Sequence, residues 1–230
     1  MGSLNHWLRP GLFWQSMRIA WRYLNEGEDP WVRLEHDEFG RDPTPHFFGA
    51  GAVRPFQWYL EGPSEVAPAT LDELLEWLMA CEYVHDSVLF QVEDYWQHPR
   101  TFEQLRKGDC EDHALWAWRK FHELGLDTEL VVGRSRSAAS SDEFGGHAWV
   151  HVNNGNHVLV IETTCKDKDG MVLTLEDARD HYRPHVSIDG KLRGRMYGGL
   201  PQTVLEAKRA KKEARREPPR PPSPPINALS

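Results

Sequence analysis

The chain has 230 residues, of which 40% are hydrophobic and 27% charged, a composition typical of a folded globular protein with a sizeable core. Its formal net charge is −8, although the segment from Glu206 onward is basic, with seven Lys and Arg against three Glu. The rest of the chain is therefore strongly acidic, which argues against a nucleic-acid partner. No stretch approaches the roughly 18 uncharged apolar residues that a membrane-spanning helix needs.

Three widely spaced cysteines, Cys81, Cys110 and Cys165, make an odd number, which argues against a disulfide framework. Residues 1–29 are interrupted by Arg and Asn and do not resemble a signal peptide. These features predict a reduced compartment, and we expect a cytoplasmic protein. The same N-terminal stretch fits an amphipathic helix with four apolar residues on one side: Trp14, Met17, Trp21 and Leu24.

Residues 26–68 carry Pro, Gly, Trp and charged residues without a sustained period, which predicts irregular connections with short strands. The run Thr70–Glu73 is a capping box, and it predicts a helix whose leucines share one face. Cys81, near the end of that helix, is expected to be a core thiol. The run Thr101–Gln104 repeats the box and predicts a second, short helix.

The run Gly108–Ala114 places Cys110 in the first turn of a predicted amphipathic helix. A thiol at a helix N-terminus lies beside unpaired backbone N–H groups and the positive end of the dipole, and both favour the thiolate. This geometry suits a nucleophile. The flanking acids are open to a plainer interpretation as capping and dipole-complementing residues, and their charge would raise the thiol pKa: Asp109, Glu111 and Asp112.

Gly125 is a C-terminal stop for this helix, and beyond it the pattern changes to the two-residue period of strands. The polar, Ser-rich segment at 135–146 is predicted to be a mobile lid, and the Asn-rich segment at 153–156 a hairpin turn. Three β-rich runs surround these segments: 128–134, 147–152 and 157–163.

Residues 174–182 predict a short capped helix, and Asp189-Gly190 predicts a tight turn. A cysteine-bearing helix followed by antiparallel strands predicts an α+β fold, with that helix packed on an antiparallel β-sheet. We expect three parts: an N-terminal helix with an aromatic-rich segment packed on the core (1–69), a catalytic domain (70–202), and a charged helix with a disordered Pro-rich tail (203–230).

A thiolate nucleophile needs an imidazole that takes and returns its proton, and a third group that orients the imidazole. His147 is the best placed of the twelve histidines, because it opens a strand directly after the Ser-rich segment. Glu162 is the one carboxylate of the following β-rich run, so the order along the chain is Cys110, His147, Glu162. The alternatives are a hydrogen-bonded strand histidine and a solvent-facing glutamate.

Two motifs of the chain resemble those of the bacterial transglutaminase-like cysteine proteinases. In that family an Asp-x-Trp-x-x-Pro element precedes Gly-Asp-Cys-Glu-Asp-aromatic-Ala. Here residues 94–99 read Asp-Tyr-Trp-Gln-His-Pro, and residues 108–114 read Gly-Asp-Cys-Glu-Asp-His-Ala, with Leu124-Gly125 ending the helix. The resemblance covers roughly residues 80–165 and implies a papain-like core.

The resemblance implies Cys110 as the nucleophile and His147 as the base. The third member of the triad is typically Asp in the family, whereas this chain offers Glu162. The aromatic residue that follows Glu-Asp in the family is replaced by His113. Some members bind calcium through acids beside the cysteine, which implies a calcium site at three residues: Asp109, Glu111 and Asp112.

These observations predict a cysteine-dependent hydrolase of amide bonds, a peptidase or deamidase, that acts on a protein or peptide through a thioacyl intermediate. The chemistry itself requires no cofactor, and calcium is the metal that the resemblance suggests. One alternative is acyl transfer to an amine, as in crosslinking transglutaminases. A second alternative is a transglutaminase-like fold used for binding, with the Pro-rich tail recruiting an aromatic-grooved partner.

Overall fold

The computed structural model describes residues 29–33, 44–136, 144–155 and 157–214. Residues 27–200 form one compact unit, and residues 1–26 together with 201–230 form another. The predicted N-terminal helix, the centre of the predicted lid and the Pro-rich tail lie outside the described residues, and the predicted division into three parts stays a prediction. Among the described residues, no helix combines the length and the apolar character that crossing a bilayer requires.

Short elements occupy the chain ahead of the cysteine-bearing helix. Where we predicted short strands, residues 44–60 form short helices instead, because Phe56 and Tyr59 are three residues apart and bury one helical face completely. The elements are η1 (Pro45–Phe47), α2 (Phe56–Leu60), α3 (Leu71–Met79), β1 (Glu82–Tyr83), α4 (Asp86–Leu89), α5 (Pro99–Leu105) and β2 (Lys107–Gly108).

Two of these helices test the predicted capping boxes. The Thr70 hydroxyl accepts a hydrogen bond from the Glu73 N–H at 3.2 Å, as predicted for the start of α3. The second box was placed too late, because α5 begins at Pro99 rather than at Thr101. Proline has the backbone geometry of a first helical position, and the His98 ring accepts the next N–H at 3.1 Å. Cys81 is buried, as predicted.

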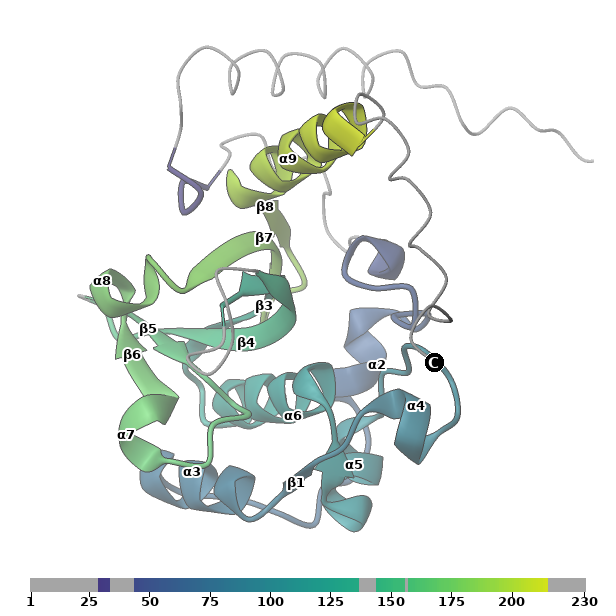
Figure 1. Cartoon of the computed structure of the whole chain (residues 1–230). Helices are drawn as coiled ribbons and strands as arrows, with labels where there is room; N and C mark the ends of the chain where they lie inside the picture. The colour runs from purple at the N-terminus through teal and green to yellow at the C-terminus, as the bar shows by residue number, and fades with distance from the viewer. Residues whose placement is uncertain (1–28, 34–43, 137–143, 156, 215–230) are drawn as a thin grey trace, which may run out of the picture. The chain divides into compact units, whose positions relative to one another are not determined.

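Helix α6 (Cys110–Glu123) is the centre of the structure. It lies between the large sheet on one side and helices α3 and α5 on the other (Figure 1). More of this helix is buried than the predicted apolar face alone, since every residue from Glu111 to Phe121 is buried. The helix ends as predicted before Gly125, whose φ of +76° is a left-handed conformation that glycine adopts without strain.

An antiparallel six-stranded sheet with the order β6-β5-β4-β3-β7-β8 covers α6. The three predicted strands are present, although β5 ends two residues before the predicted limit. The predicted helix at 174–182 is only one turn, α8 (Leu175–Ala178), because the chain then enters a strand that the sequence analysis missed. The strands are β3 (Asp127–Ser135), β4 (Gly145–Asn153), β5 (Val158–Ile161), β6 (Val172–Thr174), β7 (Tyr182–Asp189) and β8 (Gly194–Met196).

Side chains alternate between the two faces of this sheet. Ala148, Val150 and Ile161 belong to the main core, which includes the apolar residues of α6. Trp149 and Val160 belong to a smaller cluster on the opposite face. The α+β class, with the cysteine-bearing helix packed on an antiparallel sheet, is thus confirmed.

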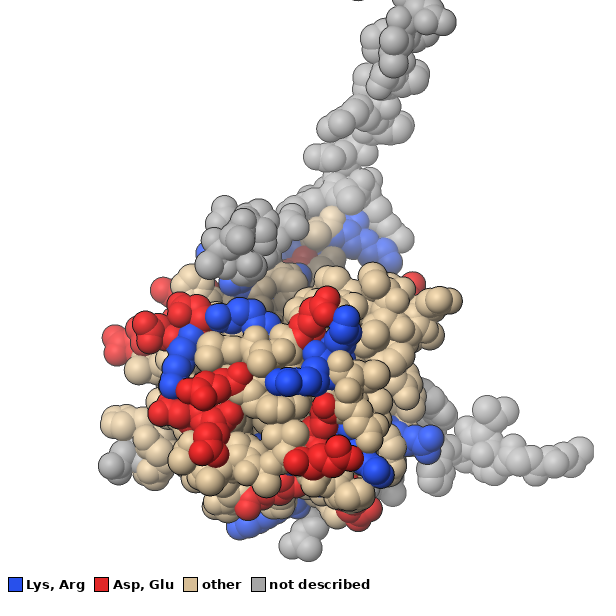
Figure 2. All heavy atoms as spheres, turned by 90° about the horizontal axis from the view of Figure 1, so that it is seen from below, with Lys and Arg blue, Asp and Glu red and all other residues tan. Residues whose placement is uncertain are grey.

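The remaining elements are α7 (Lys168–Met171) and the charged helix α9 (Gly199–Ala214), which was predicted from about residue 203. Figure 2 shows the described unit from below. Acidic and basic side chains are interspersed over this face, and neither sign covers it alone.

Gly133 positions the strand that carries His147, and it allows a direct test of the fold. Gly133 pairs with His147 across β3 and β4, and a Cβ atom at Gly133 would lie 2.2 Å from the Arg183 carbonyl oxygen of β7. We expect Gly133→Ala to lower the free energy of unfolding by about 1–3 kcal/mol in urea denaturation. Gly145→Ala is the matched control, since a Cβ atom there meets nothing within 4 Å. Equal denaturation midpoints for the two variants would refute the tight contact.

Candidate active site

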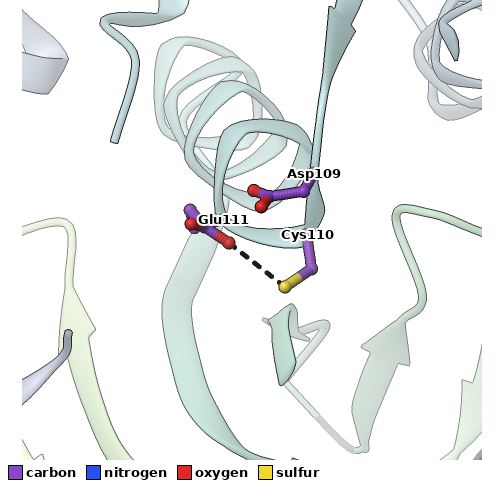
Figure 3. Close-up of side chains that lie close together, drawn as sticks. All are labelled: Asp109, Cys110 and Glu111. Carbon is purple, nitrogen blue, oxygen red and sulfur yellow. Dashed lines mark hydrogen bonds between the residues drawn. The ribbon is translucent and has the colours of Figure 1, made fainter. Parts of the chain in front are cut away.

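Cys110 is the first residue of α6, and only Asp109 separates it from the end of β2. Its thiol donates a hydrogen bond to Glu111 Oε2 at 3.2 Å, and the Asp109 carboxylate lies beside the pair (Figure 3). The backbone N–H of Ala148, on β4, lies close enough to the sulfur to lower the pKa of the thiol. The nucleophile candidate is therefore held against the residue that follows His147 in the sequence.

The thiol is not activated in this arrangement. Burial, followed by the charges of Glu111 and Asp109, raises the pKa of the Cys110 thiol well above its usual value. The Ala148 N–H lowers the thiol pKa, but burial and the acids outweigh it. Asp109 is the N-cap residue of α6, yet its side chain makes no capping hydrogen bond, which rules out the plain capping role considered above.

A cluster of acids surrounds the first turn of α6 and extends beyond the predicted residues. Burial raises the pKa of Asp86 to about 6, and burial together with Asp109 raises the pKa of Glu111 to about 10. Burial also raises the pKa of Asp112 well above its usual value. Carboxylate oxygens approach within 4.8 Å of one another in two overlapping groups: Asp86, Asp109 and Asp112, and Asp86, Asp94 and Glu111.

The hydrogen bonds of this cluster leave ligand positions open. Asp112 accepts the backbone and side-chain N–H groups of Gln97, at 2.8 and 2.5 Å. Asp86 Oδ1 and Asp109 Oδ1 are buried and have no hydrogen-bond partner within the described part of the chain. Unpaired carboxylate oxygens at close range are the donor set that a hard cation such as Ca²⁺ prefers, so these residues fit a cation. Asp86 and Asp94 were not predicted as ligands, since only tertiary contact brings them here.

His147 and Glu162 are in hydrogen-bond contact. The ring Nε2 lies 2.7 Å from Glu162 Oε2, and the two side chains are 13% and 12% exposed. Glu162 follows the last residue of β5, and its backbone N–H donates to the Met171 carbonyl. Burial opposes ionisation of this carboxyl, but His147 and hydrogen bonds from Thr164 lower its pKa to about 2.

The structure brings His147 and Glu162 together. It brings Cys110 close to Ala148, the residue after His147, but not into contact with the His147 ring. Among the described residues, no hydrogen bond joins the Cys110 thiol to the imidazole. The ring of His147 shares with Trp149 the sheet face that points away from α6, with ring centroids 6.1 Å apart.

A cavity of about 780 Å³ lies on the His147 side of the site, and Cys110 is not among the described residues that line it. His147, Glu162 and Tyr182 line it, and so does Tyr83, whose ring stacks at 6.2 Å on His113 of α6. Burial, and then the charges of both Cys110 and Glu162, raise the pKa of the Tyr83 hydroxyl. Tyr83 therefore lies within electrostatic reach of both halves of the site.

His113, the residue that departs from the family motif, is completely buried in α6. Its Nδ1 lies 2.8 Å from the Asp109 carbonyl oxygen, and its Nε2 lies 3.4 Å from Lys166 Nζ. Burial lowers the pKa of His113 to about 4, so the ring is neutral at pH 7. Its contacts join the start of α6 to the segment that follows Glu162.

No protein-family model and no curated protein matches the chain. Among solved structures, EGTA-treated LapG of Legionella pneumophila is similar, with 17% identity over 63% of this chain and 68% of its own, at a TM-score of 0.42. A second LapG structure is 16% identical over 70% of this chain and 79% of its own, also at 0.42. Calcium-bound LapG is 15% identical over 66% and 84%, at 0.44. Likeness at this level concerns the arrangement of the chain and assigns no activity to it.

The lowered pKa of Glu162 predicts a pH-dependent contribution to stability. A carboxyl whose pKa falls from 4.5 to about 2 on folding stabilises the fold above pH 4.5, and this contribution is lost as pH falls toward 2. We expect Glu162→Gln to lower the free energy of unfolding at pH 7 by up to about 3 kcal/mol. In urea denaturation at several pH values, its difference from wild type should shrink below about pH 4.5.

The exposed Glu176 provides a matched control for this measurement. We expect Glu176→Gln to change the free energy of unfolding by less than about 0.5 kcal/mol at each pH. A Glu162→Gln difference that is the same at pH 3.5 and pH 7 would contradict the lowered pKa of Glu162.

Proposed function

We propose that the protein is a cysteine-dependent hydrolase of amide bonds in peptides or proteins, with Cys110, His147 and Glu162 as its triad. The observation that carries the proposal is the 2.7 Å contact between His147 Nε2 and Glu162 Oε2. Both residues line a cavity, and Cys110 lies close to Ala148, the next residue of the same strand. The motif around Cys110 supports the same function, since it resembles that of transglutaminase-like cysteine proteinases.

In this proposal, each nitrogen of the imidazole has a distinct task. The contact of Nε2 with Glu162 favours the tautomer that carries its proton there, so Nδ1 is left to take the proton of the Cys110 thiol. The thiolate then attacks the amide carbonyl, and the imidazolium returns the proton to the departing amine. Water, deprotonated by the same ring, attacks the resulting thioester and releases the acid, which restores the thiol. The Cys110 backbone N–H, at the start of α6, is a donor for the oxyanion.

This reaction requires the thiol to leave Glu111. In the structure, Cys110 donates to that carboxylate, and the surrounding acids disfavour a second negative charge. We propose that Ca²⁺ binds at the acid cluster, with Asp86, Asp94, Asp109 and Glu111 as ligands beside Asp112. A bound divalent cation neutralises carboxylates and thereby makes a nearby thiolate less costly.

Mass spectrometry of a proteome-derived peptide library, exposed to wild type and to Cys110→Ser, tests the reaction. We expect wild type to produce new peptide termini, or a mass increase of about 1 Da at Gln where it deamidates, because water resolves the thioester. Cys110→Ser should produce neither. Crosslinked peptides with loss of ammonia would instead show acyl transfer to an amine. Equal products from both proteins would contradict the role of Cys110.

Thermal unfolding after dialysis against EDTA tests the cation. We expect 1 mM Ca²⁺ to raise the melting temperature by about 5–10 °C, the shift for a ligand at about 100 times its Kd. Asp86→Asn should abolish this shift while leaving the metal-free protein at least as stable, because it removes a buried charge from a repulsive cluster. Asp169→Asn, at an exposed aspartate, is the control and should keep the shift. An unchanged melting temperature for wild type would refute the site.

A further inference from the structure

Glu162 is held by more than its histidine. Its Oε1 accepts the Thr164 backbone N–H at 2.9 Å and the Thr164 hydroxyl at 2.7 Å. Its Oε2 accepts the Tyr182 hydroxyl at 2.8 Å, and His147 Nε2 lies 2.7 Å from the same oxygen. Each carboxylate oxygen therefore has two partners, which satisfies an ionised carboxylate that is almost fully buried.

These contacts compensate for the length of the side chain. A glutamate has one more rotatable bond than the aspartate found at this position in the resembling family, so it loses more conformational freedom when one orientation is imposed. Thr164, in the segment that follows β5, donates hydrogen bonds to one carboxylate oxygen. Tyr182, at the start of β7, donates a hydrogen bond to the other. Two anchors from different elements leave the carboxylate a single orientation in which Oε2 faces the imidazole.

The Tyr182 ring is independently held. It packs edge-on against Trp149 with ring centroids 5.2 Å apart, and it lies 6.3 Å from the His147 ring. Both Thr164 and Tyr182 line the cavity that contains His147. Removal of the Tyr182 hydroxyl alone therefore deletes the hydrogen bond to Glu162 and keeps the aromatic packing.

We propose that Thr164 and Tyr182 are positioning residues that act through Glu162 to fix the tautomer and direction of the His147 ring. This role rests on the proposed function. In this role neither residue touches the reacting atoms. Each fixes the position of one carboxylate oxygen of Glu162. A hydrogen bond to a charged group contributes about 1.5–3 kcal/mol, which corresponds to about a 10- to 100-fold change in a rate that depends on it.

Three variants test the proposal: Tyr182→Phe, Thr164→Val and Thr164→Ser. The first readout is the ¹⁵N spectrum of His147, assigned with a His147→Asn variant, which reports the tautomer directly. The second is the rate at which iodoacetamide alkylates Cys110 in the presence of Ca²⁺, compared by mass spectrometry with Cys81 and Cys165. Two matched controls are Tyr59→Phe, at a buried hydroxyl without a hydrogen-bond partner among the described residues, and Thr128→Val, at a buried threonine of β3.

We expect wild type to show one tautomer with the proton on Nε2. Tyr182→Phe and Thr164→Val should each show mixed tautomers, and Cys110 in each should be alkylated about 10- to 100-fold more slowly than in wild type. Thr164→Ser should recover most of the wild-type values, because it keeps both donors, and the two controls should match wild type. A single Nε2–H tautomer together with wild-type alkylation in both Tyr182→Phe and Thr164→Val would overturn the proposal.

The two readouts separate this proposal from the proposed function. If wild-type Cys110 is alkylated no faster than Cys81 and Cys165, the proposed nucleophile fails. The tautomer spectra would still show whether Thr164 and Tyr182 orient His147. If Cys110 is fast and the variants change neither readout, the positioning role alone fails.

Discussion

Burial of the first turn of α6 is the constraint on which the candidate site depends. Because this helix is enclosed on all sides, the acids around Cys110 are removed from water, and each needs a proton, a donor or a cation. The same burial presses Cys110 against β4, beside His147. A more exposed helix would weaken the repulsion among these acids, but it would no longer hold Cys110 against β4. Neutralisation of the acids is therefore the step that reconciles a stable fold with a reactive thiol.

Short-range rules account for the parts of the fold that the sequence predicts well. The Thr70 cap and the left-handed Gly125 each depend on a few neighbouring residues, and both occur where the sequence places them. The hairpin turn between β4 and β5 also occurs where it was predicted, and the Asn154 N–H donates a hydrogen bond to the His157 carbonyl there. That turn sets the register of β4 against β5, and it places the run that leads to Glu162 beside the run that begins at His147.

Long-range contacts account for what the sequence does not reveal. Strand β7 alternates apolar with polar residues as a strand does, but it contains Pro184, which argues against a central strand, and its partner β3 lies some fifty residues earlier. Asp86 carries no local signal, and Asp94 belongs to the motif at 94–99, but neither is marked as a cation ligand until the fold brings both to α6. Tyr182 reads as the end of a helix until β7 carries its hydroxyl to Glu162. In each case the partner is distant in the sequence.

The early end of β5 leaves the edge of β4 open at the point where the Cys110 thiol approaches Ala148 and the His147 ring faces the other way. Neighbouring residues of a strand point to opposite faces, so Ala148 faces α6 while His147 faces away. A strand that continued to residue 163, as predicted, would by extension of the register place Thr163 opposite Ala148 and compete for the backbone that contacts the sulfur. Because the chain instead turns away after Ile161, the edge of β4 stays open at His147, and the cavity extends from Tyr83 to Tyr182 across it. The same turn carries Glu162 off the strand and onto the imidazole.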